Sequence, residues 1–175
     1  VNNEDIENKK IFLNGVIFRE LSKHYSNWRS LKSLNNWLMQ NNVIGVTDLN
    51  TRNLTIKIRE NGALKATLIN GVKKNLNIKS IVKKTEDWSG INNNDLAKVV
   101  SCKKPYVYKN IPKSKNRIDI VAIDFGCKKN ILDLFLENNF RVTVVPYTYN
   151  YDQIMKFKPR GVFLSNGPGD PFATS

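Results

Sequence analysis

The sequence predicts an α/β protein made of two parts joined by a linker. Residues 1–110 alternate short apolar runs with helical apolar stripes, which indicates a mixed α/β amino-terminal domain. Residues 111–116 are polar, charged and broken by a proline, as linkers often are. Residues 117–175 hold three apolar runs separated by two helix-like segments, and short links between such elements favour parallel pairing with right-handed crossovers. The second part is therefore predicted to be the first βαβαβ portion of a doubly wound parallel sheet.

The first part is expected to contain several short elements of both kinds. Strands are expected at residues 11–20, 43–46, 63–70 and 106–108, and helices at residues 33–40, 50–61, 76–84 and 95–100. Gly15 is a possible bulge in the first strand, Ser33 can cap the first helix, and Asn94 can cap the last one. Gly62 is placed to end the second helix. Residues 87–94 have loop composition, and residues 106–108 are interpreted as the last strand of this domain.

The second part begins with an almost continuous apolar run over residues 117–125, which is typical of a strand buried on both faces. Gly126 then turns the chain into a helix. The remaining elements are expected at residues 129–139 and 152–157 for helices, and 142–145 and 161–164 for strands. No Gly-x-Gly-x-x-Gly pattern follows the first strand, so a dinucleotide site is not expected.

The formal net charge of +13 raises the alternative of a basic nucleic-acid-binding module. The lysines are scattered in pairs such as Lys103-Lys104, and arginine, the usual reader of phosphate and guanine, is rare beside lysine. Asn, Lys and Ile are used heavily, as an AT-rich genome would require. We therefore interpret the charge as codon bias on a solvated surface, expect no nucleic-acid partner, and favour a plastid (chloroplast stroma), with a bacterial cytoplasm as the alternative.

The composition also indicates the class of protein and the redox state of its compartment. The chain is 41% hydrophobic and 25% charged, which is typical of a globular protein. No apolar run approaches the roughly 20 residues needed to span a bilayer, so no membrane partner is expected. Cys102 and Cys127 lack CxxC spacing, which favours a reducing compartment without a disulfide framework.

The most informative stretch follows the last predicted strand, where Leu164-Ser-Asn-Gly-Pro-Gly-Asp-Pro171 forms a loop with two glycines and two prolines. Ligands of open α/β sheets bind beyond the carboxyl ends of the strands. Glycines allow close backbone approach, and fixed N–H groups can bind an anion or stabilise an oxyanion. An ordinary turn after a strand is the alternative, because Gly and Pro mark most turns.

That loop resembles the one in class I glutamine amidotransferases, in the form found in carbamoyl-phosphate synthase small chains. The stretch Ile123-Asp-Phe-Gly-Cys-Lys-Lys-Asn-Ile131 is similar to the first βα unit of the same family. Two more stretches, Ser26-Asn-Trp-Arg29 and residues 48–62, resemble the amino-terminal domain that other amidotransferases lack. Another class I amidotransferase is the alternative, and Asn166 and Asp170 beside the glycines argue against it.

The resemblance implies that the chain is part of the glutamine-hydrolysing small subunit of a carbamoyl-phosphate synthase. Gly167 and Gly169 would contact glutamine, and the Gly167 N–H would stabilise the oxyanion. The family's catalytic Cys, His and Glu would lie beyond residue 175, so no catalytic residue and no metal ligand is assigned here, and the chain alone is expected to be inactive. The partner would be the large subunit, which would bind ATP and a divalent metal and make carbamoyl phosphate for arginine and pyrimidine synthesis.

Cys127 is the one residue that could supply a nucleophile within the chain. It follows the first strand of the second part and precedes Lys128 and Lys129, and both a helix start and nearby lysines favour a thiolate. A nucleophilic cysteine also needs a base, and His24 is the only histidine. The resemblance does not place the catalytic cysteine at Cys127, so we expect this thiol to be inert.

Overall fold

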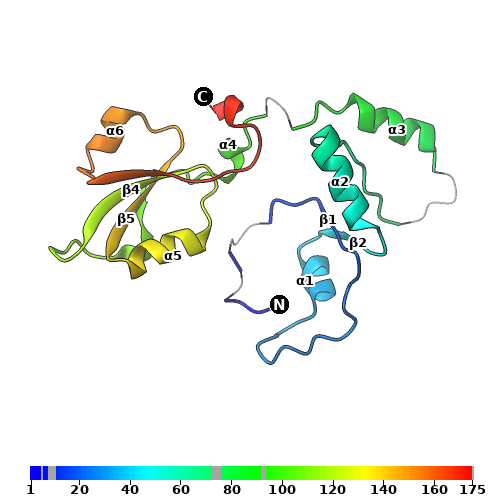
Figure 1. Ribbon diagram of the computed structural model, residues 1–175, viewed down its shortest axis with the longest axis horizontal. Coiled ribbons are helices and arrows are strands. Elements are labelled where there is room, and N and C mark those ends of the chain that lie inside the picture. Colours follow the sequence, from blue (N-terminus) through cyan, green and yellow to red (C-terminus); the bar gives the residue numbers. More distant parts are fainter. Residues whose placement is uncertain (5, 8–10, 72–75, 92–93, 175) are drawn as a thin grey trace. The chain divides into compact units, whose positions relative to one another are not determined.

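The computed structural model describes residues 1–4, 6–7, 11–71, 76–91 and 94–174 (Figure 1). These residues form two compact units, Val1–Gly90 and Ile91–Ser175, and each is described by itself. Residues 92–93 of the predicted loop 87–94, and residue 175 at the end of the predicted second part, lie outside the described residues.

The first unit contains a small parallel β-α-β arrangement. Strand β1 (Gly15–Ile17) pairs with β2 (Ile44–Val46), and α1 (Leu34–Gln40) connects them. Ser33 caps α1 by accepting a hydrogen bond from the N–H of Asn36 at 3.1 Å, as predicted, and Leu38 is buried. Strand β1 is shorter than the predicted 11–20. Gly15 pairs in register with Ile44 instead of forming a bulge, and a Cβ at this glycine would lie 2.1 Å from Leu68 Cδ1.

Two further helices follow, α2 (Thr51–Asn61) and α3 (Ile78–Asp87). Asn50 caps α2 and Gly62 ends it with a φ of 76°, so the predicted helix is confirmed. Asn77 caps α3, which is displaced toward the carboxyl end relative to the predicted residues 76–84.

The strand predicted at residues 63–70 is wrong, because this segment has no regular secondary structure and pairs with no described strand. Side chains hold it instead of a backbone ladder. Lys65 Nζ donates to the carbonyl of Glu86 at 2.7 Å, and the hydroxyls of Thr67 and Thr85 share a hydrogen bond. Both contacts are made to α3, and most side chains of the segment remain exposed.

The second unit is built on a four-stranded sheet with the order β3-β5-β4-β6. The strands are β3 (Tyr106–Val107), β4 (Ile118–Asp124), β5 (Phe140–Pro146) and β6 (Gly161–Leu164). Strand β4 is central and runs parallel to both β5 and β6, whereas β3 is antiparallel to β5. The predicted parallel βαβαβ arrangement is confirmed, and β3 is an addition to it.

The helices α5 (Lys129–Glu137) and α6 (Tyr151–Met155) lie on opposite sides of this sheet (Figure 1). Residues of β4 alternate between two cores, since successive strand side chains point to opposite faces. Ile120 and Ala122 pack with Leu132 of α5, while Val121 and Ile123 pack with Ile154 of α6. Helices on both faces make the sheet doubly wound, as the sequence predicts.

Three short elements complete the unit: α4 (Ala97–Val100), the 3-10 helix η1 (Tyr108–Asn110) and the 3-10 helix η2 (Pro171–Thr174). Helix α4 begins later than the predicted residue 95. The carboxylate of Asp95, and not the side chain of Asn94, accepts the N–H of Lys98 at 3.1 Å in its first turn.

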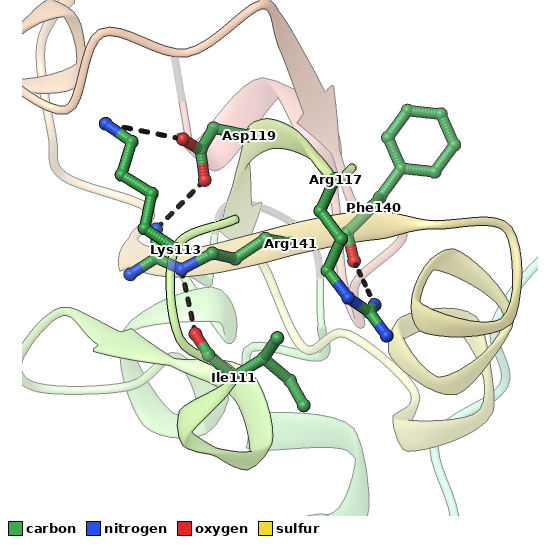
Figure 2. Close-up of polar contacts among 6 residues, drawn as sticks. All are labelled: Ile111, Lys113, Arg117, Asp119, Phe140 and Arg141. Carbon is green, nitrogen blue, oxygen red and sulfur yellow. Dashed lines mark hydrogen bonds and ion pairs between the residues drawn. The ribbon is translucent and has the colours of Figure 1, made fainter. Parts of the chain in front are cut away.

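The segment predicted as a linker, residues 111–116, lies within the second unit and not at the division between the units. Figure 2 shows how the sheet holds it: Arg141 Nε donates to the Ile111 carbonyl at 2.8 Å, and Lys113 pairs with Asp119 at 3.5 Å. Arg141 also donates to Asp119 at 3.0 Å, so one arginine fixes the segment and two strands. The residues around Tyr106 were predicted as the last strand of the first domain, and this is wrong: β3 covers the edge of β5, which would otherwise be unpaired.

Candidate functional site

The candidate site lies at the carboxyl ends of β4 and β6. These strands are parallel neighbours in which Ile123 pairs with Leu164, so the turn after β4 and the loop after β6 leave the same edge of the sheet. A pocket of about 460 Å³ opens there. The residues that line it are Ala97, Phe125, Leu164, Ser165, Asn166, Gly167, Pro168, Gly169, Asp170, Pro171 and Thr174. Apolar walls with a few polar groups are typical of small-molecule sites of this size.

Gly167 is pressed against the backbone of the turn after β4. A Cβ at this position would lie 2.2 Å from the carbonyl oxygen of Phe125 and 2.8 Å from its Cβ. Real Cβ atoms do not approach other atoms so closely, so only glycine fits without movement. The requirement for glycine at this position is therefore already set by the protein's own packing.

Two other glycines of the site adopt backbone conformations that disfavour other residues. Gly169 has a φ of 87°, and Gly126 has a φ of 120° in the turn after β4. A Cβ on Gly126 would also lie 2.9 Å from Val100 Cγ2 and 3.1 Å from Pro168 Cδ. The turn after β4 and the loop after β6 are thus packed against each other through glycines.

The loop offers hydrogen-bond donors to a ligand. Within the described part of the chain, the N–H groups of Gly167 and Gly169 have no acceptor. Pro168, between the two glycines, and Pro171, two residues after the second, stiffen the loop and carry no N–H of their own. N–H groups held at a pocket can bind an anionic or carbonyl oxygen, and this role of the loop stays a prediction from the sequence.

Ser165 fixes the base of the loop and was not predicted. Its hydroxyl accepts the N–H of Phe125 at 2.9 Å and donates to the carbonyl of Asn166 at 2.8 Å. This buried side chain therefore ties the turn after β4 to the loop after β6.

Asp124, at the end of β4, is a buried carboxylate that was also missed. Its Oδ1 accepts the N–H groups of Gly126 and Cys127 at 2.9 and 2.8 Å, which shapes the turn. A charged residue at the end of an apolar run could have signalled this role, because buried charges need partners.

The described residues of the second unit include no histidine that could serve either cysteine as a base. Cys127 is not among the residues that line the pocket, and His24 belongs to the first unit. Burial, with Asp124 nearby, raises the pKa of the Cys102 thiol to about 12. Among the residues that the structure describes, no three His, Cys, Asp or Glu side chains could together hold a metal ion.

The chain matches two family models in the order expected from its motifs. Residues 1–68 match the model of the carbamoyl-phosphate synthase small chain, CPSase domain, and residues 121–175 match that of glutamine amidotransferase class-I. A carbamoyl phosphate synthase small chain from Bartonella henselae is 40% identical over 189 residues, which cover 99% of this chain. The chain belongs to the carbamoyl-phosphate synthase small-chain family. The resemblance inferred from the motifs is therefore confirmed.

Other relatives of the family agree. The small chains of Vibrio cholerae and Zymomonas mobilis are each 38% identical and cover 97% and 99% of this chain. The chain spans about half the length of the curated relatives it matches, between 47% and 49% for these three. These relatives are bacterial, so they give no support to the expected plastid origin and are consistent with the bacterial alternative. Within the described residues, no helix is long and apolar enough to cross a membrane.

Proposed function

We propose that the chain is part of the glutamine-hydrolysing small subunit of a carbamoyl-phosphate synthase. In this role it supplies ammonia to a large subunit, which makes carbamoyl phosphate from bicarbonate and ATP. The observation that carries the proposal is the position of Gly167 beside a pocket of about 460 Å³, where its N–H has no acceptor among the described residues. Family membership supports glutamine as the substrate of this pocket, because the relatives are named carbamoyl phosphate synthase small chains.

Gly167 and Gly169 are the proposed glutamine-binding residues. The N–H of Gly167 would stabilise the oxyanion that forms when a nucleophile attacks the side-chain amide of glutamine. The contact between Gly167 and Phe125 supports this role, because it holds the donor before the substrate arrives. Preorganised donors of this kind are worth about 10²–10³ in rate.

The described residues that line the pocket include no cysteine and no histidine. Hydrolysis through a thioester needs both a thiolate and a base, so we expect the chain of 175 residues to release no glutamate by itself. We also propose that this chain holds no cofactor, and that ATP and a divalent metal bind to the large subunit. The product would serve arginine and pyrimidine synthesis in a bacterial cytoplasm.

The test is the transfer of nitrogen from glutamine. The protein would be translated from its whole reading frame and prepared with the large subunit of the same organism. Glutamine labelled with ¹⁵N in the side-chain amide should then yield labelled carbamoyl phosphate when bicarbonate and ATP are present. Synthesis from ammonia but never from glutamine would contradict the proposal.

A control separates this function from the nucleic-acid alternative, which the comparisons do not favour. A nucleic-acid-binding module would bind DNA or RNA with an affinity that falls steeply with log salt. We expect only weak binding with a shallow slope.

A further inference from the structure

One wall of the pocket comes from outside both matched regions. Residues 69–120 belong to neither family match, yet Ala97 of α4 lines the pocket and is only 1% exposed. Its neighbour Leu96 packs on the glycine loop, since a Cβ at Gly169 would lie 3.2–3.3 Å from three Leu96 atoms. At the other end of α4, Val100 packs on Gly126. The segment 95–102 therefore contacts both glycine-containing loops of the site.

Three hydrogen bonds fasten this segment to the ends of the two central strands. The Cys102 N–H donates to Asp124 Oδ2 at 2.8 Å, at the end of β4. The Ser101 hydroxyl accepts the N–H of Tyr147 at 3.1 Å, just after β5, and the Tyr147 hydroxyl donates to Asp95. The bond from Tyr147 lowers the pKa of the Asp95 carboxyl, so the carboxylate stays charged at its ordinary pKa and somewhat below it. The wall is thus fixed to the same sheet edge that carries the loop.

We propose that segment 95–102 is a specificity wall of the glutamine pocket, and that Asp124 and Tyr147 are positioning residues that hold this wall against the glycine loop. The inference rests on the proposed function and adds to it the residues that size and place the site. Gly169 lacks a side chain and sits in a left-handed conformation, so its position depends on what packs against it. Leu96 supplies that packing, and displacing the segment would displace the donor N–H groups.

Asp124→Asn distinguishes the two roles of this carboxylate. Its Oδ1 receives two N–H groups of the turn and its Oδ2 receives one from Cys102. An asparagine keeps two bonds when its oxygen takes the Oδ1 position, but its NH₂ then faces the Cys102 N–H, donor against donor. The variant therefore releases the wall while preserving the turn after β4.

Ala97→Val tests the wall directly, and Tyr147→Phe tests it from a residue that does not line the pocket. Val99→Ala is the matched control, because Val99 is in the same helix but is 54% exposed. The experiment measures KM and kcat for glutamine, and the rate with ammonia, in the assembled synthase. Ala97→Val and Asp124→Asn should raise KM for glutamine by between about tenfold and about 100-fold, and Tyr147→Phe by less. The ammonia-dependent rate should be unchanged in every variant.

The outcomes separate this inference from the proposed function. If the unmodified protein transfers no nitrogen from glutamine, the proposed function fails. If it does, but Ala97→Val and Asp124→Asn leave KM for glutamine as in Val99→Ala, the wall assignment is overturned. Equal loss of the glutamine-dependent and ammonia-dependent rates would also overturn it, because it would mean general destabilisation.

Discussion

Replacing Gly167 with alanine should disrupt the site through a steric clash with the backbone of Phe125. The added Cβ would lie 2.2 Å from the Phe125 carbonyl oxygen and 3.0 Å from its carbonyl carbon, and both are backbone atoms that cannot rotate away. An ordinary contact begins near 3.4 Å, so the loop must move by roughly 1 Å at this point. Overpacking of this kind typically costs about 1–3 kcal/mol of stability. Because the same movement displaces the Gly167 N–H, we expect the glutamine-dependent rate to fall by about 10²–10³.

The assay compares glutamine with ammonia as nitrogen donor in the assembled synthase, and follows the free energy of unfolding in parallel. Gly161→Ala is the control, because a Cβ there would meet its nearest neighbour, Ile120 Cγ2, at an ordinary 3.7 Å. Gly167→Ala should lose the glutamine-dependent rate and keep the ammonia-dependent rate, while Gly161→Ala keeps both. Loss of both rates in Gly167→Ala would refute the oxyanion assignment, and an unchanged glutamine rate would refute the steric argument.

Three further outcomes are expected. Ser165→Ala leaves the partly buried N–H of Phe125 without its acceptor and should lower the free energy of unfolding by about 1–3 kcal/mol in chemical denaturation, whereas an unchanged stability would contradict this role of the hydroxyl. The hydrogen bond from Lys109 lowers the pKa of Asp133, so this carboxylate stabilises the fold above its unfolded pKa of about 3.9 and loses that contribution as the pH falls through its lower folded pKa. Acid titration of stability should therefore be flatter in Asp133→Asn, and identical curves would contradict this. The pKa of about 12 predicts that Cys102, the one thiol left within residues 1–175 of a Cys127→Ser variant, is alkylated at pH 8 far more slowly in the folded than in the unfolded chain. Equal rates, followed in the peptide that contains Cys102, would be contrary to the structure.

The elements that the sequence predicts best are those whose whole length is buried or capped. The run at residues 117–125 predicts β4 because a strand covered on both faces by helices is apolar at nearly every position. Helix α2 was predicted because the cap at Asn50 and the stop at Gly62 are local signals. In contrast, β3 is a pair of residues, Tyr106–Val107, and nothing local says which sheet receives it. Its pairing with β5 depends on a distant partner.

The same distinction explains the site. The glycine loop was predicted from its own residues, since Gly and Pro carry their conformational meaning locally. The contacts by which Ser165 and Asp124 join separate parts of the site were missed, because these partners are far away in the chain. The Ser165 hydroxyl accepts a hydrogen bond from the N–H of Phe125, 40 residues earlier. The Asp124 carboxylate accepts one from the N–H of Cys102, 22 residues earlier. Residues 95–100 were predicted as a helix, but only the fold brings the segment 95–102 to the pocket.

Hydrogen–deuterium exchange tests the central claim most directly, because it reports where glutamine binds. The assembled synthase would be labelled with and without L-glutamine, with D-glutamine as the control ligand, and peptides would be followed by mass spectrometry. Peptides over residues 164–172 and 95–102 should exchange more slowly with L-glutamine only, and peptides over α2 should not change. Protection that is confined to other parts of the subunit, while glutamine is bound, would show that the loop of Gly167 and Gly169 is not the glutamine site.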